Sequence, residues 1–344
     1  MNTRNNTIDL AKFIAALLVV AIHTSLFSDV NGTLYFIFNE LICRLGVPFF
    51  AICTGYYLCL KVKGYKIVWE QEKKLLKIYG LWTLLYFIFL IPNWIEIDYL
   101  SFNNCIGYIK SAILTGSYFH LWYILYVIYA LPVYYLCINY LRPSSWLWLA
   151  IVLYGTNALY YGYSSFFPEG SACLQFLSLI DKGYAVVKSQ FVILPMLLCG
   201  ACLTRYAVSF KKGIALLMFA FATLIVEASL LKYYAKLENV SYIFMILPTA
   251  FFLFATLLEV KISKPIFKHF GKMSLIIYCV HPMFCKYVDG MAPNTISSYI
   301  LVCSLSILVA LFWIKVKPIN RTNIFKYENS GNDSCTTGID KIQK

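Results

Sequence analysis

Three histidines lie within or at the edge of hydrophobic segments of this 344-residue chain: His23, His120 and His281. Imidazole titrates near neutrality, so it can take a proton from a reacting group and return it. Because ionisable side chains are costly inside a bilayer, each of these residues is by default a candidate for a functional role. Four charged residues also stand where a simple membrane anchor would carry leucine: Lys12, Glu40, Arg44 and Glu227.

The first hydrophobic segment carries Lys12 and His23, eleven positions apart. At about 100° and 1.5 Å per residue, this spacing places both within about 20° of one helix face, roughly 16 Å apart along the axis. A single face of this helix would then run from one edge of the membrane, near Lys12, into the opposite half, near His23. Two other interpretations stay open: Lys12 extends its ammonium group to the interface, and His23 is an interior histidine with satisfied hydrogen bonds.

Arg44 follows Glu40 by four residues, which is the favourable order for an ion pair within a helix. It lies about ten residues into its expected helix and therefore near the bilayer midplane. Arginine at that depth costs roughly several kcal/mol unless it is paired or hydrated. The sequence thus predicts a polar interior, with structural pairing to Glu40 as the alternative.

Counted from the external surface, His23, His281 and Glu227 come to comparable depths of roughly 8 to 12 Å. His120 opens a helix on the same side, so four titratable groups from four helices share one slab of the membrane. Glu227 could orient an imidazolium, accept a proton itself, or serve only as a structural partner. Tyr278 precedes His281 by three residues and so lies on a neighbouring face.

The composition indicates the fold class. Apolar residues make up 60% of the chain, charged residues 13% and aromatic residues 18%, and the mean hydropathy is +0.70. These values are typical of an all-α integral membrane protein with several spans. Runs long enough to cross about 30 Å of hydrocarbon predict ten transmembrane helices, at residues 8–28, 34–60, 75–92, 119–140, 145–163, 188–206, 212–233, 241–259, 269–289 and 296–316.

Most of the 29 lysine and arginine residues fall in loops on one side of this arrangement. The positive-inside rule then predicts that both termini are cytoplasmic. The net charge of +13 is divided among short juxtamembrane loops, which favours membrane lipids as partners and argues against nucleic acid. We expect residues 1–317 to form one transmembrane domain, with the first segment retained as a span, and residues 318–344 to form a disordered polar tail.

Other cofactor signals are weak in this sequence. The cysteines fall mostly in apolar runs, where they behave as small hydrophobic residues, and a disulfide between Cys105 and Cys173 is an open alternative. No zinc spacing, P-loop, dinucleotide fingerprint or nucleophile elbow occurs, so no metal is expected. Lys74 and Lys77 share one helix face at the membrane surface, where they could bind a polyanionic cofactor or lipid head groups.

Five segments, in order, resemble the acyltransferase-3 family of transmembrane acyltransferases: IDLAKFIAALLVVAIH, RLGVPFFAICTGYYL, KKLLK, HLWY and GKMSLIIYCVHPMF. The resemblance runs from Ile8 to about Trp313. Within the family, the chain is similar to the membrane domain that precedes the racemase domain in the membrane-bound serine racemases of vancomycin resistance. Only a short tail follows Trp313, so neither racemase activity nor pyridoxal phosphate is expected.

The resemblance implies that an acyl group, usually acetyl, moves from cytoplasmic acyl-CoA to a hydroxyl of a cell-surface glycan, lipid-linked sugar or peptidoglycan precursor at a bacterial plasma membrane. It implies that His23 is the catalytic histidine. Lysine replaces the arginine common at the cofactor positions, and lysine grips phosphate only as a point charge. The expected roles are catalysis for His23, His281, Glu227 and Arg44, with His23 as general base or as a transient acyl carrier. Lys12, Lys74 and Lys77 are expected to contact coenzyme A, and His120, Trp122, Tyr123 and Tyr278 to lie on the substrate side of the site.

Two other classes of function stay open. Intramembrane charges around a hydrated cavity also suit a transport module, and the racemase-linked relatives have been thought to supply serine. Against transport, the sequence has no evident inverted repeat and no pair of broken helices in corresponding halves. A noncatalytic scaffold would leave the intramembrane ionisable groups without a use.

Overall fold

The computed structural model describes residues 5–62, 64–237, 240–262, 269–288 and 290–316. All regular structure in these residues is helical, which confirms the predicted fold class. The predicted tail at 318–344 lies outside the described residues. The helices are α1 (Asn6–His23), α2 (Gly32–Tyr35), α3 (Gly46–Lys61), α4 (Tyr65–Glu96), α5 (Phe102–Leu114), α6 (Trp122–Tyr140), α7 (Pro143–Tyr163), α8 (Ala172–Lys182), α9 (Tyr184–Cys202), α10 (Phe210–Tyr234), α11 (Ile246–Glu259), α12 (Phe270–Val288) and α13 (Thr295–Val316).

Each of the ten expected spans has a helical counterpart in this structure. Seven helical segments among the described residues are long and apolar enough to cross a membrane. The helices α7, α11 and α12 occupy the remaining three expected positions but are shorter or less apolar than those seven. The cytoplasmic location of the termini stays a prediction.

Two short helices, α5 and α8, were not expected. Each begins after a serine whose hydroxyl accepts a backbone hydrogen bond: Ser101 from Asn104 N at 3.3 Å and Ser171 from Leu174 N at 3.3 Å. Serine at this position satisfies one of the unpaired N–H groups of the first helical turn. These N-caps were the available signal, but both segments are too short to span a membrane.

The second expected span is one continuous run with an irregular centre. A π-helix at Phe36–Ile42 and a 3-10 helix at Cys43–Leu45 join α2 to α3. Both departures from α-helical geometry fall where Glu40 and Arg44 lie. Such π-helical turns are often found at functional sites.

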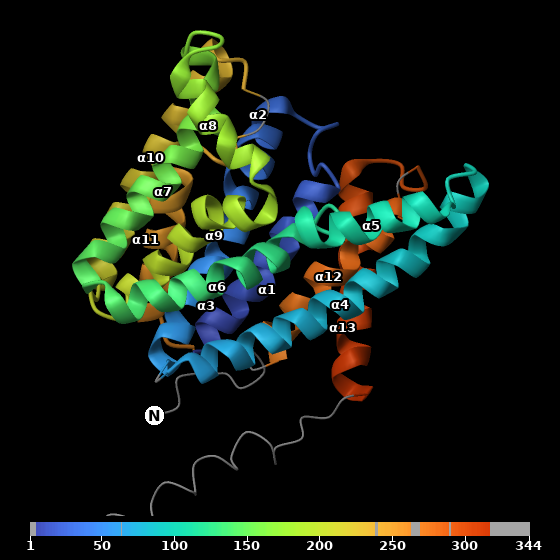
Figure 1. Ribbon diagram of the computed structural model, residues 1–344, viewed down its shortest axis with the longest axis horizontal. Coiled ribbons are helices and arrows are strands. Elements are labelled where there is room, and N and C mark those ends of the chain that lie inside the picture. The colour runs from blue at the N-terminus through green and yellow to red at the C-terminus, as the bar shows by residue number, and fades with distance from the viewer. Residues whose placement is uncertain (1–4, 63, 238–239, 263–268, 289, 317–344) are drawn as a thin grey trace, which may run out of the picture.

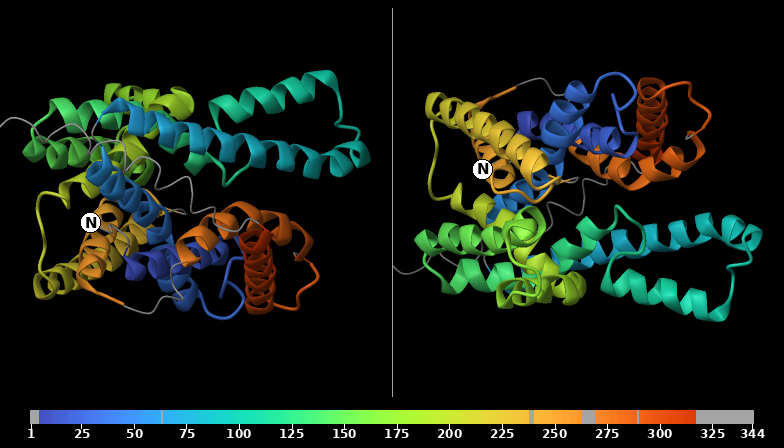
Figure 2. Two further views of the ribbon diagram at one scale, coloured as in Figure 1. Left: turned by 90° about the horizontal axis from the view of Figure 1, so that it is seen from below. Right: turned by 90° about the horizontal axis from the view of Figure 1, so that it is seen from above.

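The helices form two groups that meet at α3 and α9. Figure 2 shows α4 to α9 on one side and α1, α3 and α10 to α13 on the other, while Figure 1 shows α4 and α5 as a hairpin that projects from the bundle. Close approach of α3 and α9 depends on two glycines. A Cβ atom on Gly200 would lie 2.1 Å from the carbonyl oxygen of Ile52, and one on Gly55 would lie 2.1 Å from that of Leu197.

Tyrosine hydroxyls connect the two groups in the interior. Tyr86 on α4 donates to the carbonyl of Cys279 on α12 at 2.8 Å, and Tyr134 on α6 donates to that of Gly55 at 2.7 Å. Both rings are fully buried. Where water is absent, such bonds fix the relative positions of helices because a buried hydroxyl without a partner is unfavourable.

Candidate active site: a histidine cluster between two cavities

The three predicted histidines come together from three parts of the chain. His23 ends α1, His120 lies in the turn before α6, and His281 lies within α12. The ring centroids of His23 and His281 are 5.3 Å apart and nearly stacked, and those of His120 and His281 are 5.5 Å apart. The structure therefore brings these residues into one cluster, which we call the histidine cluster.

The first helix ends at His23 rather than at the expected residue 28. Ser25 and Phe27 have φ angles of 49° and 75°, which a right-handed helix cannot accommodate. His23 is consequently exposed at a helix end, while His120 and His281 are buried. Of the three imidazoles, His23 is the one that a bound molecule can reach most directly.

A hydrogen bond to the backbone fixes the tautomer of the neutral His281 ring. Its Nδ1 lies 3.1 Å from the carbonyl oxygen of Ile277. Because a carbonyl only accepts, Nδ1 carries the hydrogen in this bond, and Nε2 of the neutral ring is left as an acceptor. That Nε2 is buried without a partner, as are both ring nitrogens of His120. The Tyr278 hydroxyl donates to the carbonyl of His120, which joins α12 to the turn before α6.

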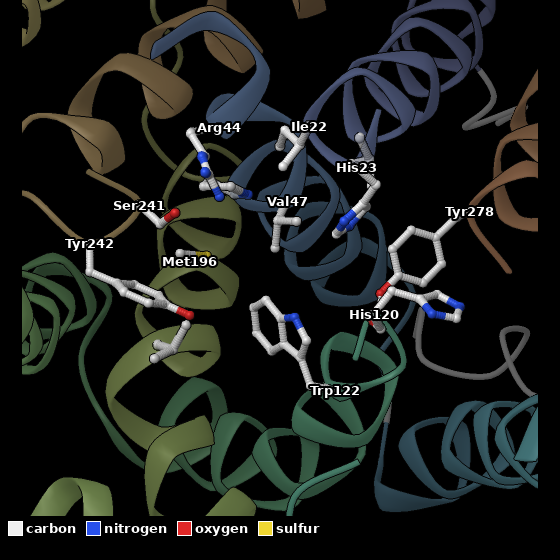
Figure 3. Close-up of a pocket in the computed structure, with 13 residues that line it drawn as sticks. Ile22, His23, Arg44, Val47, His120, Trp122, Met196, Ser241, Tyr242 and Tyr278 are labelled. Carbon is white, nitrogen blue, oxygen red and sulfur yellow. Dashed lines mark hydrogen bonds between the residues drawn. The ribbon is translucent and has the colours of Figure 1, made fainter. Parts of the chain in front are cut away.

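A cavity of about 200 Å³, here called the central cavity, adjoins the histidine cluster. Figure 3 shows Arg44, Ser241 and Tyr242 on one side of it and His23, His120 and Tyr278 on the other, with Trp122 between them. The remaining walls are mostly apolar, from Val19, Ile22, Val47, Pro48, Val192 and Met196.

A second cavity of about 490 Å³, here called the vestibule, also reaches His23. Its lining is largely polar and includes Asp29, Lys286 and Thr295. Asp29 accepts hydrogen bonds from the Thr295 hydroxyl and from its backbone N–H at 2.9 Å, and these bonds lower the pKa of the Asp29 carboxyl. His23 lines both cavities, so it lies where they meet.

A third cavity of about 310 Å³, here called the lysine cavity, lies near the other end of α1. Lys12 and Lys61 line it, and the Lys12 Nζ is 5.3 Å from the centre of the Tyr57 ring. Lys74 and Lys77 are exposed on α4 and do not line this cavity, whereas Gln71 of the same helix does. The structure thus separates Lys12 from the lysine pair that the sequence grouped with it.

Tyr123 lines neither the lysine cavity nor the central cavity, but it lies next to a lining residue of each. Its ring centroid is 5.9 Å from that of Tyr278, which lines the central cavity, and its side chain lies near that of Thr54, which lines the lysine cavity. The ring of Phe50 packs against it at 6.4 Å. Lys12 and His23 therefore line different cavities, and Tyr123 lies next to residues of both.

Glu227 lies away from the histidine cluster. Its carboxylate accepts backbone hydrogen bonds from Phe244 and Met245, both at 2.8 Å, and one from the Tyr163 hydroxyl at 2.6 Å. It does not line the central cavity. Its bonds instead hold the turn at 241–245, from which Ser241 and Tyr242 enter that cavity.

The structure adds residues that sequence reasoning missed. Ser241 and Tyr242 lie in a turn that was expected to be helical, and Asp29 and Lys61 sit in segments interpreted only for topology. Arg44 lines the central cavity and also pairs with Glu40, so both interpretations of that residue hold. Cys105 and Cys173 are free thiols. Among the described residues, no group of three histidine, cysteine or acidic side chains could hold a metal ion.

These features define a helical membrane protein with imidazoles gathered beside internal cavities. Residues 5–314 match the family model described as an acyltransferase domain, which covers nearly the whole chain. The chain therefore belongs to the acyltransferase-3 family, and the resemblance seen in the sequence is confirmed. Membership supports an acyltransferase-type activity in general. No solved structure matches the chain.

The chain is also similar to curated racemases of enterococci. An amino-acid racemase of Enterococcus faecalis is 36% identical over 128 residues, covering 36% of this chain and 17% of that protein. Another from the same species is 26% identical over 347 residues, covering 92% and 47%. A serine/alanine racemase of Enterococcus gallinarum is 25% identical over 331 residues, covering 90% and 46%. The chain thus spans about half the length of the last two relatives.

Proposed function

We propose that this protein is an O-acyltransferase that moves an acyl group, acetyl in the simplest case, from cytoplasmic acyl-CoA to a hydroxyl acceptor. A cell-surface glycan, a lipid-linked sugar or a peptidoglycan precursor would supply that hydroxyl. The observation that carries the proposal is the position of His23, which lines two cavities and stacks on His281. A base that must meet a donor and an acceptor needs access from two directions.

In the proposed reaction, His23 removes the proton of the acceptor hydroxyl while its oxygen attacks the thioester carbonyl. The C–O bond forms, the C–S bond breaks, and the proton passes from His23 to the leaving thiolate. His281 supports this transfer because its Nε2 is an unpartnered acceptor within the same ring stack. The histidine cluster can therefore hold the proton between its removal from the acceptor hydroxyl and its delivery to the leaving thiolate.

The donor would bind on the side of the lysine cavity. Lys12 and Lys61 offer two ammonium groups to the phosphates of coenzyme A, and the polar lining of that cavity suits a charged ligand. The thioester would then reach His23 past Tyr123, which lies next to lining residues of both cavities. Lys74 and Lys77 would act only from the surface of α4.

The test uses purified full-length protein in lipid nanodiscs, with labelled acetyl-CoA and a cell-envelope fraction as acceptor. His23→Ala should lower acyl transfer by at least about 100-fold, as expected for loss of a general base, while insertion and solubility stay unchanged. His269→Ala is the matched control, because His269 lies about 18 Å along the helix axis from His281. Unaltered transfer in His23→Ala would exclude the assigned role.

A parallel measurement separates transfer from transport. The same protein in vesicles is supplied with labelled serine, and uptake is compared with release of coenzyme A from acetyl-CoA. Release of coenzyme A that depends on His23 would support the proposed acyltransferase activity. Serine uptake without any coenzyme A release would favour the transport module instead.

A further inference from the structure

We infer that Trp122 is a catalytic residue, whose indole N–H group stabilises the oxyanion formed when the acceptor attacks the thioester carbonyl. This role rests on the proposed acyl transfer. In that reaction the carbonyl oxygen takes the electron pair of the C=O bond as the new C–O bond forms, and returns it as the C–S bond breaks. The negative charge exists only between these two events, so a donor placed at this oxygen accelerates the reaction.

The walls of the central cavity offer little stabilisation for such a charge. Aliphatic side chains of α1, α3 and α9 form much of the lining of this cavity of about 200 Å³. Burial of an unpaired charge in such surroundings is strongly unfavourable. His23 lines this cavity and would take the proton of the attacking hydroxyl, so the oxyanion would form beside it. A hydrogen-bond donor is therefore needed on the same side of the cavity.

Several polar groups around the cavity are already engaged within the protein. The Tyr278 hydroxyl donates to the carbonyl of His120, and the Arg44 guanidinium pairs with Glu40 at 3.2 Å. Both ring nitrogens of His120 are buried, so a molecule in the cavity does not reach them. These groups leave the oxyanion without a donor.

The indole Nε1 of Trp122 is a free donor in the cavity lining. Within the part of the chain that the structure describes, it donates to no protein atom, and it is not buried. An indole N–H group can only donate, so it does not compete with His23 for a proton. Figure 3 shows Trp122 with its nitrogen on the side of His23, whereas Ser241 and Tyr242 lie on the opposite side of the cavity.

The position of the indole ring is fixed by its neighbours. Tyr126 packs edge-on against it, with ring centroids 5.0 Å apart, and the centroid of Tyr123 lies at 6.3 Å. The turn before α6 also passes close to its backbone. Gly116 has a φ angle of 121°, and a Cβ atom there would lie 3.2 Å from both the nitrogen and the Cα of Trp122. A donor that is held in place beforehand costs no reorganisation when the charge develops.

Trp122→Phe keeps an aromatic ring and removes the N–H group. In nanodiscs with labelled acetyl-CoA and the cell-envelope fraction, this variant should lower kcat by about 100-fold or more. The KM for acetyl-CoA and the melting temperature should stay close to those of the wild type. Replacement of Trp122 by benzothienylalanine, which carries sulfur in place of N–H in a ring of the same shape, should give the same loss. This second variant separates the missing donor from a change in packing.

Trp146→Phe is the matched control, because it also removes an indole N–H group. That group donates to the carbonyl of Cys137 at 3.1 Å, and Trp146 does not line the central cavity. The control should lower the melting temperature and leave kcat unchanged. Tyr242→Phe removes a hydroxyl on the opposite side of the cavity, and its effect on kcat should be much smaller than that of Trp122→Phe.

Three results would overturn the catalytic role of Trp122: a kcat close to that of the wild type in the benzothienylalanine variant, an equal loss of kcat in Trp146→Phe, or a larger loss in Tyr242→Phe. If the wild type still shows transfer that depends on His23, each of these results leaves the proposed function intact. A wild type that turns over no acetyl-CoA, or does so without His23, would refute the proposed function and the role of Trp122 together.

Discussion

Replacement of Glu227 by alanine tests whether this carboxylate acts on the substrate or on the protein. The change removes the acceptor for three donors: the N–H groups of Phe244 and Met245 and the hydroxyl of Tyr163. Hydrogen bonds to a charged group contribute about 1.5–3 kcal/mol each. Because Glu227 also lines a groove that is open to its surroundings, part of this loss is recovered, and we expect Glu227→Ala to lower the free energy of unfolding by about 2–4 kcal/mol.

The assay combines thermal unfolding in nanodiscs with steady-state kinetics. A looser turn at 241–245 would move Ser241 and Tyr242, so the KM for the acceptor should rise more than kcat falls. Tyr163→Phe removes one of the three bonds and should cost only about 1 kcal/mol. Our reasoning would be wrong if Glu227→Ala left the protein as stable as the wild type while kcat collapsed, because that pattern indicates direct participation in the chemistry.

Three further predictions concern other parts of the structure. Gly200→Ala should reduce the yield of folded protein, because overpacking against Ile52 costs about 1–3 kcal/mol or more. Gly80→Ala is the control, because a Cβ atom there meets open space. Equal melting temperatures of the two variants would contradict the close contact of Gly200 with Ile52. Tyr123→Ala should raise the hydrolysis of acetyl-CoA in the absence of an acceptor, because it removes the ring beside the proposed path of the thioester. Tyr123→Phe keeps the ring and should not; release of coenzyme A without acceptor is the measurement. Hydrogen bonds with Thr295 lower the pKa of the Asp29 carboxyl. Their contribution to stability is therefore present above the ordinary pKa of 3.8 and is lost as the pH falls below that value. At such low pH, amide exchange at the start of α13 should accelerate in the wild type but not in Asp29→Asn.

The sequence determined the helical membrane class because a bilayer leaves few choices. A chain in hydrocarbon must satisfy its backbone hydrogen bonds locally, so the length of each apolar run translates directly into a helix. The pairing of Glu40 with Arg44 was equally predictable, since residues four apart on a helix are neighbours. Lys12 and His23 could be placed on one helix for the same reason.

Only the tertiary structure decided which side chains from different helices meet. The stacking of His23 on His281 depends on where α1 stops, and that was set by the positive φ angles of Ser25 and Phe27. Glu227 finds partners 17, 18 and 64 residues away, beyond the reach of any local pattern. Depth along a helix axis can be counted from the sequence, but the direction in which a side chain points is fixed by packing. For that reason the histidines converged as the sequence predicted, whereas Glu227 turned toward the 241–245 turn instead.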